Sequence, residues 1–142
     1  MTRKDFFARV GFGAAALLVP GCISGLATSC SKDDEGSVTP APTNIDFTVD
    51  ISTGALATNG GYITQQGIVV ARENATTFWA VSAACTHEGT QVAYVSGSNS
   101  FHCPNHGQNF SNVGAVTTGG KTSKALTKYN TTLTGTSLRV FS

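Results

Sequence analysis

The stretch CTHEGTQVAYVSGSNSFHCPNHG, residues 85–107, contains two closely spaced pairs of cysteine and histidine. One residue separates Cys85 from His87, and two residues separate Cys103 from His106. The whole chain has only 3 histidines, so these two short arms hold most of them. Each arm offers a thiolate and an imidazole, which are ligands for transition metals. A metal centre built from two loops is therefore the first hypothesis.

The residues between the two arms favour a β-hairpin. Apolar and polar residues alternate in TQVAYV (90–95), and the turn-forming run SGSN (96–99) separates it from SFH (100–102). A hairpin returns the second arm to the side of the first, so two loops that pack face to face can bring four ligands together.

Composition points to one all-β domain. The chain has 142 residues, enough for one modest core once a targeting segment is removed, and its 16 glycines separate short runs rich in Thr, Val and Ser. Charged residues make up only 12% and the net charge is +1, so the sequence predicts no nucleic-acid partner. The other predicted strands are IDFTVDI (45–51), GYIT (61–64), GIVVAR (67–72), TTFWAVSA (76–83) and a last hairpin, KALTKYNTTLTG with TSLRVF, that turns near Gly135.

Residues 1–29 have the order of a signal peptide. Arg3 and Lys4 open a basic start, and an apolar stretch rich in glycine and alanine follows. TRKDFF resembles a twin-arginine export signal in which Lys4 stands in place of the second arginine. Proline and glycine interrupt the apolar stretch, which is shorter than the ~20 residues of a spanning helix, so an uncleaved anchor helix is the weaker alternative.

Cys30 is the expected site of lipidation. It follows small residues, and the chain becomes polar directly after it, as in a bacterial lipoprotein, whereas Cys22 still lies in apolar sequence. A disulfide between Cys22 and Cys30 is the alternative. Residues 30–43 then form the lipidated cysteine and a flexible tether, and residues 44–142 form the folded domain. We expect an exported protein on the periplasmic side or at the outer membrane, attached to the membrane through its lipid.

The order of the four ligands along the chain helps to distinguish zinc from iron as the bound metal. Zinc also accepts two sulfurs and two nitrogens, but usual zinc spacings pair Cys with Cys and His with His. Here the two types alternate within each arm, so the cysteines can share one iron and the histidines another, with sulfides as bridges. The alternatives are thus an iron–sulfur protein and a zinc-stabilised binding module with no redox role.

The sequence resembles the Rieske [2Fe–2S] iron–sulfur family over roughly residues 60–141. The resemblance rests on CTH and CPNHG, on GIVVAR and TTFWAVSAAC before them, and on NFSNVGAV after them. It implies a fold of three small antiparallel sheets with cluster-binding loops at 85–90 and 103–110 in an inserted subdomain. It also implies that Cys85 and Cys103 bind the inner iron of the cluster, and His87 and His106 the outer iron.

Four neighbouring positions depart from the high-potential members of that family. Those members join the loops by a disulfide where this chain has Thr90 and Asn105, and they place a serine and a tyrosine where it has Gln108 and Phe110. Fewer hydrogen bonds to sulfur lower the potential, so we expect the lower half of the family range of about −150 to +300 mV, unless Gln108 donates in place of the serine. The loop TTGGKTSKAL (117–126) also lacks the prolines of the family.

The resemblance implies an electron carrier without a substrate site of its own. Rieske oxygenases need a further iron held by two histidines and a carboxylate, and only His102, a predicted strand-surface residue, remains here. We expect redox proteins as donor and acceptor. The alternative is the small subunit of a larger exported oxidoreductase, either arsenite-oxidase-like or quinol-oxidising.

Overall fold

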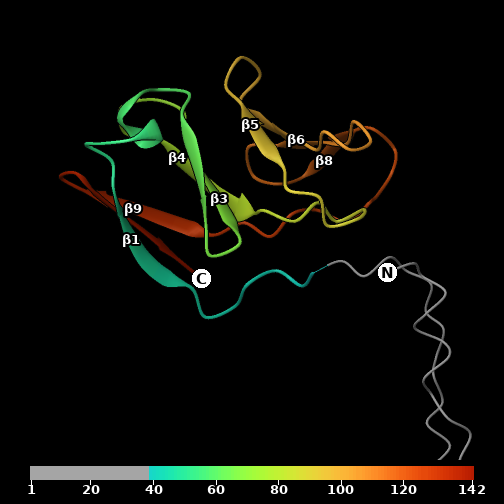
Figure 1. Cartoon of the computed structure of the whole chain (residues 1–142), viewed down its shortest axis with the longest axis horizontal. Helices are drawn as coiled ribbons and strands as arrows, with labels where there is room; N and C mark the ends of the chain where they lie inside the picture. Colours follow the sequence, from blue (N-terminus) through green and yellow to red (C-terminus); the bar gives the residue numbers. More distant parts are fainter. Residues whose placement is uncertain (1–38) are drawn as a thin grey trace, which may run out of the picture. The chain divides into compact units, whose positions relative to one another are not determined.

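The computed structural model describes residues 39–142, so the predicted signal peptide, Cys30 and most of the tether lie outside the described residues (Figure 1). This part of the chain forms ten strands and one short 3-10 helix, η1 (Ala55–Ala57), arranged as three antiparallel sheets. The predicted all-β architecture of three small sheets is confirmed. Within residues 39–142, no helix is long and apolar enough to cross a membrane.

The first sheet contains both ends of the folded domain. Its strands are β1 (Asp46–Asp50), β10 (Ser137–Phe141) and β9 (Asn130–Thr134), with β10 in the centre. The hairpin between β9 and β10 turns at Gly135, as predicted, because its φ of 60° suits glycine. The carboxylate of Asp46 accepts two hydrogen bonds from Arg139, at 2.8 and 2.6 Å, which join β1 to β10 on the exposed face.

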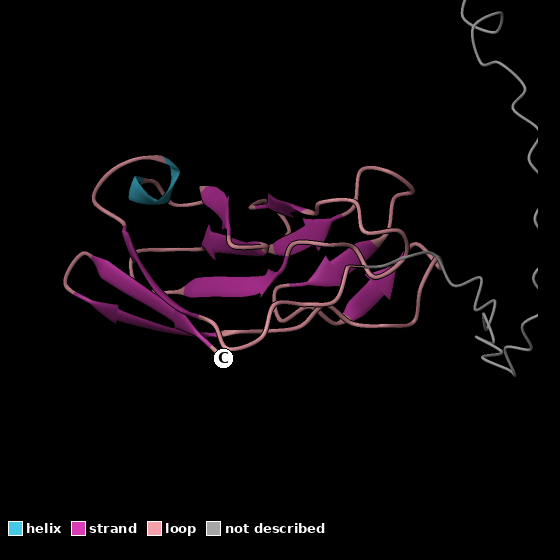
Figure 2. Ribbon diagram, turned by 60° about the horizontal axis from the view of Figure 1, so that its bottom comes forward, coloured by secondary structure: helices cyan, strands magenta, loops and turns pink. Residues whose placement is uncertain are grey.

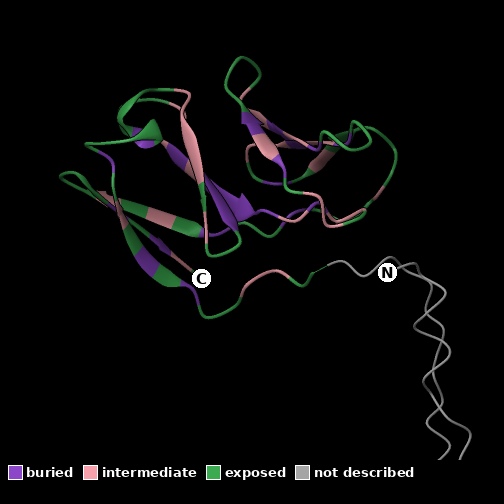
Figure 3. Cartoon of the chain, viewed as in Figure 1, coloured by how far each residue is buried: buried purple, intermediate pink, exposed green. Residues whose placement is uncertain are grey.

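The second sheet lies between two hydrophobic cores. It consists of β2 (Tyr62–Gln65), β3 (Ile68–Arg72) and β4 (Phe78–Ser82). Alternate residues of β3 enter two different cores: Ile68 and Val70 enter the first core, and Val69 and Ala71 enter the second. The continuous apolar run IVVA follows from this position, because a strand covered on both sides has no polar face. Figure 3 shows β3 and β4 as almost entirely buried.

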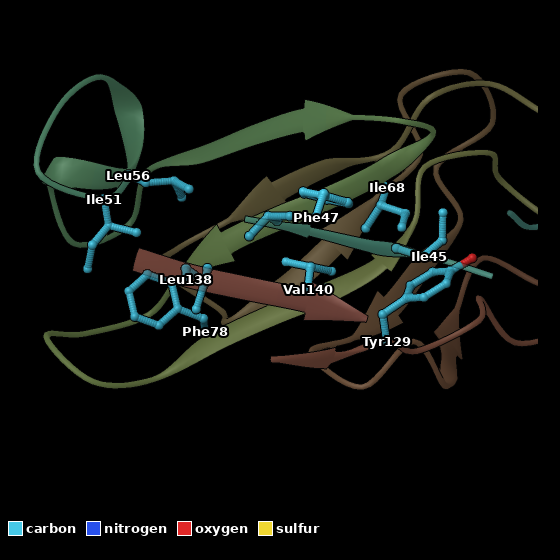
Figure 4. Close-up of a cluster of buried hydrophobic side chains, with 11 residues drawn as sticks. Ile45, Phe47, Ile51, Leu56, Ile68, Phe78, Tyr129, Leu138 and Val140 are labelled. Carbon is cyan, nitrogen blue, oxygen red and sulfur yellow. The ribbon is translucent and has the colours of Figure 1, made fainter. Parts of the chain in front are cut away.

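The first core lies between the first and second sheets. Figure 4 shows its side chains pointing inward from β1, β10 and the middle strands. The second core lies between the second and third sheets and includes both cysteines of the ligand arms. Its buried members are Val69, Ala71, Val81, Ala83, Cys85, Val92, Tyr94, Phe101, Cys103, Phe110 and Leu126. The sulfurs are thus part of a hydrophobic core.

The third sheet carries the ligand arms. Its strands, in sheet order, are β5 (Ala93–Val95), β6 (Ser100–His102), β7 (Asn109–Ser111) and β8 (Val116–Thr118). Figure 2 draws the strands of the domain in magenta and the loops between them in pink. The hairpin predicted between the arms is β5 with β6, and it is confirmed. The strands β7 and β8 were not predicted, because Asn112 and Gly114 between them are turn-forming residues that are typical of a loop.

The predicted tether meets the domain at Pro42. The hydroxyl of Tyr129 donates a hydrogen bond of 2.7 Å to the carbonyl oxygen of Pro42. Pro42 is half-buried, and a Cβ on Gly67 would lie 3.0 Å from its ring. The chain therefore contacts the domain two residues before the expected boundary at Asn44.

Candidate metal centre

The first ligand loop, residues 85–90, closes on its own backbone. The Cys85 N–H donates to the Thr90 carbonyl at 2.8 Å, and the Gly89 N–H donates back to the Cys85 carbonyl at 2.7 Å. Gly89 has a φ of 77°, in the left-handed region that favours glycine. These bonds turn the chain tightly enough for the residues between Cys85 and Gly89 to project as a tip.

The second ligand loop, residues 103–110, repeats this backbone geometry. The Cys103 N–H donates to the Gln108 carbonyl at 2.8 Å, and the Gly107 N–H donates to the Cys103 carbonyl at 3.1 Å. Gly107 has a φ of 73°. In both loops the cysteine opens the turn and a glycine four residues later closes it.

Both cysteine side chains point into the second core. Cys85 is 0% exposed and Cys103 is 1% exposed, and neither forms a disulfide. Burial raises the pKa of the Cys85 thiol, and the neighbouring Cys103 thiol raises it further, although a hydrogen bond from the His87 backbone opposes the shift. The thiol form is therefore favoured without metal, and a metal ion would displace its proton.

Both histidine side chains lie at the surface. The exposed fraction is 25% for the His87 side chain and 35% for that of His106. Their ring centroids are 4.8 Å apart and the rings meet edge to face. One carboxylate lies beside both rings: Glu88 Oε1 is 3.8 Å from His87 Nε2, and Glu88 Oε2 is 3.5 Å from His106 Nδ1.

The four predicted ligands therefore form a buried sulfur pair and an exposed nitrogen pair. Within residues 39–142, the compact group of metal-ligating side chains is His87, Glu88 and His106, whose ligand atoms lie within 4.8 Å of one another, and it does not include the thiols. A structural zinc ion would gather two sulfurs and two nitrogens around one centre. Two bridged irons need each pair on a different ion, so the donor set fits a [2Fe–2S] cluster better.

The four predicted neighbours of the site have different surroundings. Gln108 is 0% exposed, and its amide nitrogen donates to the Thr118 and Asn109 carbonyls, at 2.8 and 3.2 Å. Phe110 is fully buried in the second core and has no donor, whereas Thr90 supplies its backbone oxygen to the first loop. The amide of Asn105 donates to Glu88 Oε2 at 2.9 Å, which joins the two ligand loops.

Sequence reasoning did not identify Glu88 or Thr86 as residues of the site. Glu88 could have been identified from the sequence, because it is the acidic residue of CTHEGT and follows the predicted ligand His87. Thr86 could not have been identified in this way, because its partner is the backbone oxygen of Lys124, 38 residues away. His102 lies on β6 as predicted, with Nδ1 2.7 Å from Asn109 Oδ1, and it is not part of the ligand group.

Comparison with known proteins agrees with this geometry. The Rieske [2Fe-2S] domain family matches residues 44–130, more than half of the chain. The cytochrome b6-f complex iron-sulfur subunit of Prochlorococcus marinus (strain NATL1A) is 38% identical over 52 residues, which are 37% of this chain and 29% of that protein. The corresponding subunit of Synechococcus sp. (strain CC9605) matches to the same extent. The match thus spans less than a third of these relatives.

Solved structures show the same fold. The ferredoxin of carbazole 1,9a-dioxygenase from Nocardioides aromaticivorans IC177 superposes with a TM-score of 0.55 at 19% identity. That superposition covers 70% of this chain and 98% of the ferredoxin. This chain belongs to the Rieske [2Fe-2S] domain family, whose cofactor is a [2Fe–2S] cluster and whose chemistry is one-electron transfer.

Proposed function

We propose that this protein is an exported, lipid-anchored electron carrier in which Cys85 and Cys103 hold the inner iron and His87 and His106 the outer iron. The observation that carries the proposal is the separation of a buried thiol pair from an exposed imidazole pair. When bound, the cluster supplies one-electron redox chemistry. The chain's own residues keep the sulfur side dry and present the imidazole side to solvent.

Electrons would enter and leave at the imidazole edge. The thiols are buried within the second core, so a redox partner can approach the cluster most closely over His87 and His106. We infer that a donor and an acceptor protein use this same tip in turn.

The tether would keep that tip near the membrane. Thr39 and Pro40 line one groove together with Gly89 of the first ligand loop, so the chain reaches the domain beside the proposed cluster. Eight residues separate Cys30 from Thr39, and an extended chain between these two residues spans about 30 Å at most. A lipid on Cys30 would therefore hold the cluster end near the bilayer, which suits a partner at the membrane surface.

The reduction potential should lie in the lower half of the family range. Both N–H groups of the Gln108 amide are engaged by backbone carbonyls, so this side chain does not replace the missing serine. Phe110 has no hydroxyl to donate. With fewer hydrogen bonds to sulfur, the reduced cluster is less stabilised.

The role of small subunit in a larger oxidoreductase is the second candidate. It is favoured by the names of the two relatives, which are iron-sulfur subunits of a complex. Mild solubilisation and size-exclusion chromatography of the native protein would distinguish the two roles. A stoichiometric large chain would support the subunit role, and a single small protein would support the free carrier.

Visible and EPR spectra of the anaerobically purified full chain test the cluster ligands. We expect a rhombic signal in the reduced state that is lost in His87→Ala and in His106→Ala. His102→Ala is the matched control and should keep the signal, because its ring bonds to Asn109 on the sheet. A colourless chain with one bound zinc would contradict the proposal.

Labelling with a fatty acid in a Gram-negative host tests the anchor. Label should be incorporated by the full chain and by Cys22→Ser, and it should be absent from Cys30→Ser. Incorporation that depends on Cys22 would move the lipid to that residue, and no incorporation at all would exclude the lipoprotein.

A further inference from the structure

The ligand loops need something other than their own backbones to hold them at a fixed distance from each other. The hydrogen bonds at Cys85 and at Cys103 each lie within one loop, so they determine the conformation of that loop but not the distance between the two loops. A disulfide, which would fix the spacing, is not formed, and Thr90 and Asn105 stand at the positions where the family resemblance places it. The contacts between loops therefore come from side chains.

Gln108 joins the second ligand loop to the third loop, which we define as residues 117–126. Its amide nitrogen donates to the Thr118 carbonyl at 2.8 Å, and its Oε1 accepts from the Lys121 backbone N–H at 3.0 Å. The third loop lies so close that a Cβ on Gly119 would be 2.6 Å from the Gln108 Cα. Since Gln108 is 0% exposed, these hydrogen bonds are shielded from water.

Thr86 joins the first ligand loop to the same third loop. Its hydroxyl donates to the Lys124 carbonyl at 2.5 Å and lies 3.4 Å from the hydroxyl of Thr122. One threonine next to Cys85 thus attaches the first loop to the segment that also holds the second.

Asn105 and Glu88 join the two ligand loops directly. The Asn105 amide donates to Glu88 Oε2 at 2.9 Å, between residues that follow Cys103 and Cys85 at the loop tips. Both side chains are exposed, so this hydrogen bond is weaker than those of Gln108.

We propose that Gln108, Thr86 and the Asn105–Glu88 pair are positioning residues that act in place of a covalent bridge. They connect the first loop to the third, the third to the second, and the second back to the first. This ring holds the thiols and imidazoles at the spacing that the cluster needs. The inference rests on the proposed ligands, and the buried Gln108 contributes most to the ring.

The proposed ring of contacts among the three loops can be tested by the rate at which the full chain loses its cluster in an iron chelator. Visible absorbance under anaerobic conditions follows this loss. Gln108→Ala should lose its cluster about tenfold faster, and Thr86→Val and Asn105→Ala about two- to fivefold faster. The matched controls, Asn130→Ala and Thr132→Val on exposed positions of β9, should behave as the wild type.

The Asn105–Glu88 pair allows a sharper test. Glu88→Gln keeps an acceptor oxygen for Asn105 and should lose its cluster more slowly than Glu88→Ala, which removes that acceptor as well as the carboxylate beside His87 and His106. The double variant Glu88→Ala/Asn105→Ala should lose the cluster no faster than Glu88→Ala alone, because Asn105→Ala removes the same hydrogen bond. Additive effects of the two substitutions would contradict a shared bond.

Hydrogen exchange on the cluster-free chain gives a readout that does not depend on iron. In Gln108→Ala the Lys121 amide should exchange faster while the Cys85 amide stays protected. Unchanged Lys121 exchange with a change in cluster loss below about twofold would overturn the role of Gln108. If Gln108→Ala does not fold, the exposed Asn105 and Glu88 variants decide. Wild-type protein without an EPR signal would instead refute the ligands themselves.

Discussion

The two ligand loops have the same backbone and differ in what holds them from outside. Each starts at a buried cysteine and closes at a glycine four residues later, with a φ of 77° at Gly89 and 73° at Gly107. The histidine lies two residues after Cys85 but three residues after Cys103. The first loop is attached to its neighbours by exposed or partly exposed side chains, and the second by the buried Gln108.

This difference separates two tasks of a metal-binding loop. The cysteine and glycine positions determine the turn, because the backbone hydrogen bonds use the cysteine's own N–H and carbonyl. The residues between them are free to differ, so one loop carries its imidazole one position later than the other. Spacing between the loops then depends on side chains that the turn itself does not require.

The two loops should depend equally on their cysteines for binding the cluster. We expect Cys85→Ala and Cys103→Ala each to abolish the cluster completely, since one iron loses a thiolate in either case. Iron analysis and EPR measure the loss, with Cys30→Ala as a control that keeps the cluster. A variant of one loop that still binds a full cluster would break the equivalence.

Histidine-to-cysteine replacements test whether the two imidazoles are equivalent. His87→Cys and His106→Cys each exchange a neutral ligand for a thiolate, so the potential should fall toward the value of about −400 mV of all-cysteine plant-type ferredoxins. Protein-film voltammetry measures the shift, and His102→Cys is the control that should leave it unchanged. A fall in only one variant would show that the two loops contribute unequally.

Gly119 and Gly120 test the dependence of the second loop on the third. In Gly119→Ala the new Cβ would lie 2.6 Å from the Gln108 Cα, and backbone must move, so we expect a loss of about 2–4 kcal/mol in the free energy of unfolding. Gly120→Ala meets no atom within 4 Å and should lose only about 1 kcal/mol through its positive φ. Equal losses in denaturant titrations would argue against tight packing there.

The smallest effects are expected at the glycines that close the ligand loops. A Cβ at Gly89 or Gly107 meets no atom within 4 Å, so only the left-handed backbone opposes alanine. Each variant should lose about 1 kcal/mol, as expected for Gly120→Ala, and the two should agree within about 0.5 kcal/mol. Thermal unfolding measures both, and a clear difference between them would show that the two turns are not equivalent.

Much of the fold was predictable because its signals are local. Alternation in IDFTVDI and the turn residues between TQVAYV and SFH identify β1 and the hairpin of β5 and β6. The strands β7 and β8 were missed, because the polar and turn-forming residues of NFSNVGAVTT (109–118) are typical of a loop. The burial of both faces of β3 also depends on two sheets that the strand itself does not specify.

The sequence by itself determined the ligand types, their alternation within each arm and the glycines that close the turns. These are properties of a few adjacent residues, and they suffice to predict a metal centre, either iron–sulfur or zinc. Only the tertiary structure decided that the thiols are buried, that the imidazoles are exposed, and that Gln108 and Thr86 meet the third loop. Those contacts join residues up to 38 positions apart, and they arise only when packing of the second core brings the loops together.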